Sequence, residues 1–175
     1  MCLKVVSNVP LKAEKDIVCY KILMDHKYDD ETEYLKQHPN MSSYTSPFYN
    51  YHISKQVLAG KALMRPRESW PVSTELRDGY EDGWTLAKGY KYSINEGAIH
   101  VMTLLEEAKD YANWISAYFG KTCQIFKCVI PAGTQYYFGE DTNGYSCYAS
   151  CAIKFKGKEK DCLFPKVELK YVLNK

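Results

Sequence analysis

One segment of the chain, between Thr103 and Gly120, has the residue spacing of a long amphipathic helix and limits the folds open to the whole sequence. Its apolar residues recur at intervals of three and four, which places them on one helical face: Leu104, Leu105, Ala108, Tyr111, Ala112, Ile115 and Phe119. Thr103 and Glu106 have the spacing of a capping box, and Gly120 suits a left-handed C-terminal cap. We therefore predict a helix over residues 103–119.

The remaining chain is rich in short β-like runs that are apolar, β-branched or aromatic. They are Ile17–Leu23, Ser42–Ile53, Ala98–Met102, Thr122–Ile130, Gln135–Phe138, Tyr145–Phe155 and Val167–Leu173, with a charged turn expected at 157–160. Strands and helices do not alternate regularly, so the pattern predicts a single α+β domain over residues 1–175. We expect a mainly antiparallel sheet with one dominant helix. Residues 1–16 are expected to form an N-terminal arm, and residues 54–83 to be irregular.

Composition and charge exclude several classes of partner. The 175 residues carry a net charge of only +2, with acids and bases interspersed, so no basic surface for duplex nucleic acid is expected. No apolar run approaches the ~20 residues that span a bilayer, and the start lacks a signal-peptide segment. We expect no membrane partner and a cytoplasmic location. The seven cysteines are odd in number and poorly spaced for zinc, which indicates reduced thiols and no bound metal.

A candidate ligand site follows from the 16 tyrosines and from His100, which ends a predicted strand just before the predicted helix. Tyrosine suits half-buried sheets, interfaces and ligand clefts, and a helix start attracts anions through its free N–H groups. The alternative is that His100 only supports the fold. The candidate ligand-binding residues are Tyr20, Lys21, His100, Thr103, Tyr136, Tyr137 and Ser150, and none is assigned a catalytic role.

Several short motifs along most of the chain resemble small uncharacterised proteins of gut Bacteroidota and their phages. The motifs are Cys19-Tyr20-Lys21, Tyr44–Tyr49, Gly97-x-x-His100, Cys128-x-x-Pro131-x-Gly133-Thr134-x-Tyr136-Tyr137 and Tyr148–Ser150. This resemblance implies a phage-borne protein that acts in the cytoplasm of a bacterial host, with a role in host–phage conflict. It implies no particular activity.

The latter half of the chain also resembles ADP-ribosyltransferase-like domains. The resemblance rests on a strand leading to Thr103, the helix that follows, and the strand Cys123–Ile130 before Pro131-Ala132-Gly133. It implies that fold and the use of NAD. Tyr20-Lys21 would stand where the family has an arginine on its first strand, or His100 would correspond to the histidine of the poly-ADP-ribose branch. The catalytic glutamate of the family has no counterpart after Tyr148, where Cys151–Phe155 occupies the expected strand.

Three functions therefore follow from the sequence. The first is a small-ligand-binding module for a nucleotide-like or other anionic molecule, with no cofactor. The second is an ADP-ribosyltransferase-like enzyme that uses NAD, and the third is a tyrosine-rich module that binds a protein partner or another copy of itself. A closed pocket around Lys21 or His100 would favour the ligand-binding module. A glutamate close to His100 or Thr103 would favour the enzyme. An exposed patch of tyrosines would favour the third.

Overall fold

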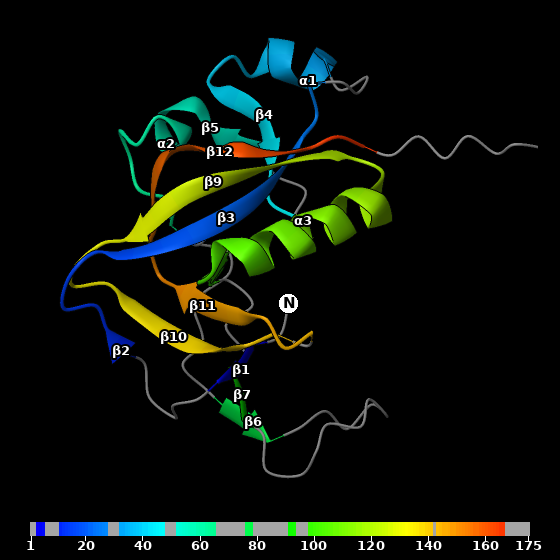
Figure 1. Ribbon diagram of the computed structural model, residues 1–175. Helices are drawn as coiled ribbons and strands as arrows, with labels where there is room; N and C mark the ends of the chain where they lie inside the picture. Colours follow the sequence, from blue (N-terminus) through cyan, green and yellow to red (C-terminus); the bar gives the residue numbers. More distant parts are fainter. Residues whose placement is uncertain are drawn as a thin grey trace, which may run out of the picture.

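The computed structural model describes residues 3–5, 11–27, 32–47, 52–65, 76–78, 91–93, 98–141 and 143–166. The strands are β1 Leu3–Val5, β2 Leu11–Lys12, β3 Ile17–Asp25, β4 Met41–Thr45, β5 His52–Ser54, β6 Leu76–Asp78, β7 Lys91–Ser93, β8 Ile99–Met102, β9 Thr122–Ile130, β10 Gln135–Glu140, β11 Ser146–Ser150 and β12 Lys154–Phe164. The helices are α1 Thr32–Gln37, α2 Lys55–Leu58 and α3 Leu105–Phe119 (Figure 1). The expected antiparallel sheet with one dominant helix is confirmed.

The described strands join in the order β12-β9-β3-β8-β11-β10-β1-β7-β6, and all their ladders are antiparallel. β4 pairs with β3 and β5, whereas β2 pairs with β10, so the segment expected as an N-terminal arm contributes β1 and β2 to the sheet. β3 and β9 form a nine-residue ladder from Ile17↔Ile130 to Asp25↔Thr122. In contrast, the described residues of β3 and β8 pair only at Tyr20↔Met102, so these two strands diverge.

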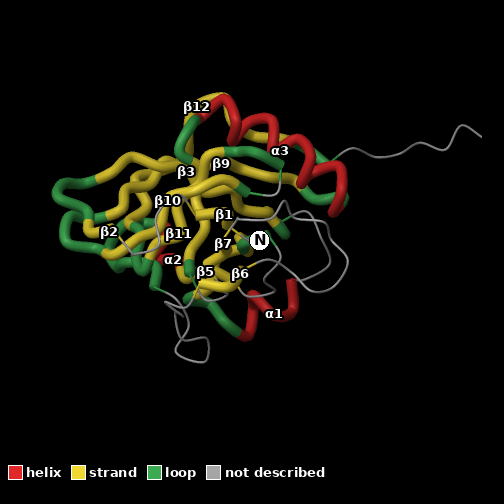
Figure 2. The backbone as a smooth tube through the Cα atoms, turned by 90° about the horizontal axis from the view of Figure 1, so that it is seen from below, coloured by secondary structure: helices red, strands yellow, loops and turns green. Residues whose placement is uncertain are grey.

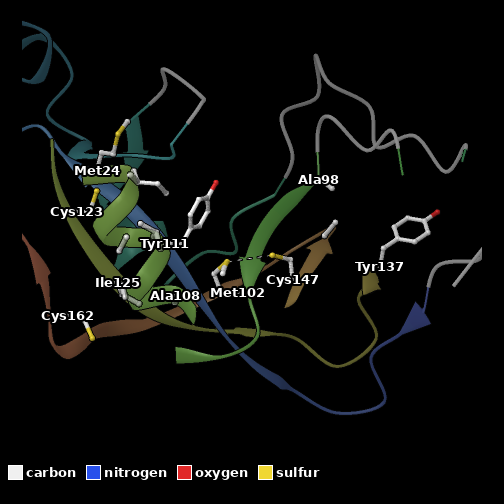
Figure 3. Close-up of a cluster of buried hydrophobic side chains, with 14 residues drawn as sticks. Met24, Ala98, Met102, Ala108, Tyr111, Cys123, Ile125, Tyr137, Cys147 and Cys162 are labelled. Carbon is white, nitrogen blue, oxygen red and sulfur yellow. Dashed lines mark hydrogen bonds between the residues drawn. The ribbon is translucent and has the colours of Figure 1, made fainter. Parts of the chain in front are cut away.

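The central strands β3 and β9 are largely buried on both faces, and each face has its own core. α3 covers one face, where Ile22, Met24 and Ile125 pack against its buried side (Figure 3). On the opposite face, Cys19 and Leu23 pack with side chains of β4, β5 and α2. Figure 2 shows α3 and α1 on opposite sides of the strands. Because successive strand residues point to opposite faces, packing on both sides explains why every residue of β9 except Lys127 is buried.

The start of α3 differs from the predicted capping box. The helix begins at Leu105, and Leu104 is its N-cap, with no side-chain capping hydrogen bond. The Thr103 N–H donates to the Ser146 carbonyl at 3.1 Å, so Thr103 continues the pairing of β8 with β11. The Glu106 carboxylate instead accepts from Lys109 Nζ at 3.0 Å. The capping box is therefore wrong, because the sheet holds the threonine, whereas the left-handed cap at Gly120 (φ 61°, ψ 35°) is confirmed.

The predicted strand over Tyr145–Phe155 is confirmed only in part, because β11 ends at Ser150 and β12 begins at Lys154. The Ser150 hydroxyl donates to the Ala152 carbonyl at 2.7 Å and closes a local turn there. β12 then continues through the charged stretch 157–160 that was expected to form a turn. Gly157, with φ 127°, lies where the register of β12 against β9 shifts, as a glycine in a bulge does. The strand predicted over Val167–Leu173 lies outside the described residues.

Candidate functional site

The structure distributes the predicted site residues over both faces of the sheet. Tyr20 and Tyr137 pack with the core beneath α3, and strand alternation places His100 on the same face, between Ala98 and Met102. Tyr136 packs with the opposite core, and alternation places Lys21 and Ser150 on that side as well. Tyr136 and Ser150 are direct cross-strand neighbours. The set therefore does not converge on a single face.

Lys21 does lie beside His100, but its contact is with the backbone. Nζ of Lys21 donates to the His100 carbonyl oxygen at 3.0 Å, and the lysine is only 7% exposed. Burial lowers the pKa of Lys21 to about 8. No carboxylate pairs with this ammonium in the part of the chain that the structure describes. The lysine thus satisfies a strand carbonyl where β3 and β8 diverge.

The His100 imidazole is neutral at physiological pH. Its Nδ1–H donates to the Ala98 carbonyl oxygen at 3.0 Å. Burial, with a further contribution from the Lys21 charge, lowers the pKa of His100 to about 3. A neutral ring offers no positive charge to an anion, so His100 does not supply the cation that an anionic ligand would need.

The first turn of α3 carries two carboxylates, Glu106 and Glu107. Oε1 of Glu107 accepts the Ser146 N–H at 3.0 Å, while the carbonyl of Ser146 accepts the Thr103 N–H. Ser146 thus holds Glu107 close to Thr103. Negative side chains at a helix start compete with any external anion for the N–H groups and the dipole. The charges around Thr103 therefore oppose an anionic ligand.

The neutral state of His100 predicts a specific loss of stability in acid. Lowering the pH from 7 to 5 should destabilise the wild-type protein by about 2 kcal/mol relative to His100→Gln. The folded pKa lies near 3 and the unfolded value near 6.5, so between them the unfolded chain binds more protons. Stability present above pH 6.5 is therefore lost as the pH falls. Urea denaturation at pH 7, 6 and 5 measures the difference, and parallel profiles for the two proteins would contradict it.

A row of stacked aromatic rings, which the sequence-based site does not include, runs along one flank of α3. The ring centroids of Tyr145 and Tyr111 lie 5.7 Å apart, those of Tyr111 and Trp114 5.8 Å, and those of Trp114 and Tyr118 5.0 Å. The last two pairs are nearly parallel, at 17° and 12°. Tyr111 is buried, whereas Trp114 is 48% and Tyr118 67% exposed. We call these four residues the aromatic row.

Three carboxylates surround the Tyr145 end of the aromatic row. Burial, followed by the charges of Asp110, Asp141 and Glu107, raises the pKa of the Tyr145 phenol. Asp141 is only 4% exposed, and its Oδ1 accepts the N–H groups of Asn143 and Tyr145, each at 2.9 Å. Its Oδ2 is buried and has no hydrogen-bond partner within the described residues. Burial also raises the pKa of Asp141. We call Glu107, Asp110 and Asp141 the acidic end.

Part of the surface formed by the aromatic row and the acidic end is recognisable in the sequence. Glu107, Tyr111, Trp114 and Tyr118 follow one another at helical spacings of four, three and four, beside the apolar face. From its helical spacing Tyr111 was predicted to lie in the core, whereas no role was predicted for Trp114 and Tyr118. Asp141 and Tyr145 flank a hairpin turn some thirty residues along the chain, so their approach to α3 depends on the pairing of β10 with β11.

Metal ligation and membrane insertion receive no structural support from the described residues. They contain no group of three or more His, Cys, Asp or Glu that could hold a metal ion. The cysteines among them, apart from the half-buried Cys151, are buried free thiols: Cys19, Cys123, Cys128, Cys147 and Cys162. No helix among these residues is long and apolar enough to cross a membrane.

No protein-family model, curated protein or solved structure shows significant similarity to this chain.

Proposed function

We propose that this protein is a binding module that recognises a basic segment of another protein through the aromatic row of α3. The observation that carries the proposal is the exposure of Trp114 and Tyr118 within a stacked row. Single exposed apolar residues are ordinary, but grouped large rings mark interaction surfaces. Trp and Tyr are also the residues that most often dominate binding energy at interfaces. An exposed aromatic patch is the feature that favours the interaction module among the three functions.

The charge around the aromatic row indicates the chemistry of the partner. Glu107 and Asp110 lie four to eleven positions from Trp114 and Tyr118 along the helix, on the same flank. The nearby Lys109 is paired with Glu106. A guanidinium or ammonium group is attracted both to aromatic ring faces and to carboxylates, whereas a phosphate is repelled by the carboxylates. The surface thus suits a cationic segment better than a nucleotide.

The distance from Glu107 at the acidic end to Tyr118 in the aromatic row sets the size of that segment. From Glu107 to Tyr118 the helix rises about 16 Å, at roughly 1.5 Å per residue. An extended peptide covers this distance with about five residues, at roughly 3.3 Å each. A short extended peptide with two or three cationic side chains therefore spans the row, and a nonapeptide probe exceeds it at both ends.

Replacing Trp114 by alanine should weaken binding of such a probe at least tenfold. A fluorescein-labelled nonapeptide of alternating arginine and serine is titrated with the protein, and its anisotropy gives the Kd. Truncating a central aromatic residue of an interface typically costs about 2 kcal/mol, or roughly thirtyfold in Kd. Tyr118→Ala should weaken binding in the same direction.

Two controls make this experiment decisive. Tyr34→Ala removes a comparably exposed tyrosine from α1, outside the row, and should leave the Kd unchanged. A matching peptide with glutamate in place of arginine should not bind. The proposal fails when the wild-type protein does not bind the arginine peptide, or when Trp114→Ala binds it as tightly as wild type.

The position of Glu107 favours a second candidate, the NAD-using ADP-ribosyltransferase-like enzyme. Its carboxylate lies close to Thr103 through Ser146, although it belongs to a helix rather than to the strand that the resemblance implies. Release of nicotinamide from NAD by the wild-type protein, and its loss in Glu107→Gln, would support this function. Absence of release from wild type would exclude it.

A further inference from the structure

The unpartnered oxygen of Asp141 points to a specific anchor for the partner, beyond general attraction to basic segments. We infer that one arginine side chain of the partner binds at the acidic end, with its guanidinium on Asp141 and Glu107 and its plane against the Tyr145 ring. This inference rests on the proposed function and names the residue type that the module recognises. Three features of the acidic end support it.

The first feature is the hydrogen-bonding capacity that the protein itself leaves unused. Oδ1 of Asp141 is occupied by the N–H groups of Asn143 and Tyr145, so the carboxylate is held in place, while Oδ2 is buried without a partner among the described residues. A buried acceptor without a donor is costly, and an incoming donor recovers that cost. Oδ2 is therefore fixed in advance for an N–H group.

The second feature is a second carboxylate held in the same way. Glu107 uses Oε1 for the Ser146 N–H, and no described residue donates to its other oxygen. The charges of Glu107 and Asp141 also act on each other, because Glu107 contributes to the raised pKa of Asp141. Two neighbouring carboxylates with one oxygen each not bound by a described residue can together accept several donors from one ligand. A guanidinium carries five N–H donors in one plane and can supply them.

The third feature is the aromatic wall beside these carboxylates. Tyr145 is half-buried, its ring packs at 5.7 Å and 45° against Tyr111, and its backbone N–H is already bound to Asp141. Because Oδ2 is buried, a ligand reaches it only if a side chain nearby moves, and we infer that this side chain is Tyr145. Arginine stacks on aromatic faces and is weakly hydrated, so it enters a mostly buried site more readily than the compact, strongly hydrated lysine ammonium.

The test compares three peptides that differ at one position. Each is a labelled nonapeptide of alternating serine and lysine, with arginine, lysine or citrulline as the central residue; citrulline keeps the shape of arginine without its charge. The wild-type protein should bind the arginine peptide at least tenfold more tightly than the other two. In Asp141→Asn, which keeps an oxygen for the two backbone N–H groups, the arginine and lysine peptides should bind within about twofold of each other. Glu107→Gln should reduce the same preference.

Control variants separate this inference from the proposed function and from misfolding. Glu106→Gln neutralises an exposed carboxylate of the same helix that pairs with Lys109, and it should keep the arginine preference. Trp114→Ala should weaken all three peptides while the preference survives. Thermal unfolding of each variant establishes that it is folded. A preference for arginine that persists in both Asp141→Asn and Glu107→Gln, or is absent from wild type, overturns the inference. Failure of all three peptides to bind wild type overturns the proposed function as well.

Discussion

Replacing Ile115 by alanine is expected to lower the free energy of unfolding by about 2–5 kcal/mol, the largest single effect that the structure predicts. Ile115 is fully buried in the middle of α3, in the core shared with Ile22 and Ile125. Removing three carbons there forfeits their burial and leaves a cavity that a close-packed core fills only partly. Chemical denaturation of the two proteins measures the difference.

A surface position on the same helix provides the control for this substitution. Asn113 is exposed, and Asn113→Ala should change stability by less than about 0.5 kcal/mol. A loss below about 1 kcal/mol for Ile115→Ala would mean that the buried face of α3 is assigned incorrectly.

Replacing Lys21 by methionine is expected to stabilise the protein at pH 7, and the advantage should shrink by about 2–3 kcal/mol between pH 7 and pH 10. The pKa of Lys21 is about 8 in the folded protein, against 10.5 as its ordinary value. Between these values the unfolded chain binds more protons, so wild-type stability rises with pH. The cost of the buried charge is fully present below pH 8 and disappears as the pH approaches 10.5.

Comparison of the two proteins isolates Lys21 from the tyrosines and cysteines that also titrate in alkali. Urea denaturation of wild type and Lys21→Met at pH 7, 8, 9 and 10 gives the difference in unfolding free energy at each pH. Methionine has a similar length but cannot donate to the His100 carbonyl, so part of the gain at pH 7 is offset. A pH-independent difference would show that Lys21 is not buried as a cation.

The elements that sequence predicted well are those whose periodicity is long and uninterrupted. The strand Ile17–Leu23 appears within β3, Thr122–Ile130 coincides with β9, and the helix of residues 103–119 appears as α3. Each has enough residues to distinguish the apolar period of a strand, two residues, from that of a helix, 3.6 residues. Each is also packed against neighbouring elements in the core. Gly120 was also predictable, because few other residues adopt its left-handed conformation.

The errors arise where a hydrogen bond that the local sequence pattern does not reveal determines the backbone conformation. Thr103 has the sequence of a helix cap, but the carbonyl of Ser146 binds its N–H in the sheet. Ser150 continues an apolar pattern, but its own hydroxyl closes a turn with Ala152. The outcome at Thr103 depends on the pairing of β11 with β8, which involves residues more than forty positions apart, whereas the outcome at Ser150 is a local turn.

The candidate site was only partly predictable for the same reason. The approach of Lys21 to His100 follows from neighbouring strands, but the faces to which these side chains point depend on how the strands pair. The sequence also cannot show that burial keeps His100 neutral. The stripe of Tyr111, Trp114 and Tyr118 is visible in the sequence, whereas the burial of Tyr111 and the exposure of Trp114 and Tyr118 depend on how α3 packs on the sheet.

Mapping the peptide on the protein by NMR tests most directly whether the aromatic row is the binding surface. Amide resonances of isotope-labelled wild-type protein are followed while the unlabelled arginine–serine nonapeptide is added. We expect the largest shifts on residues 107–118 and on Asp141 and Tyr145, and we expect Trp114→Ala to suppress them. Shifts centred on Lys21 and His100, or no shifts at saturating peptide, would contradict this expectation.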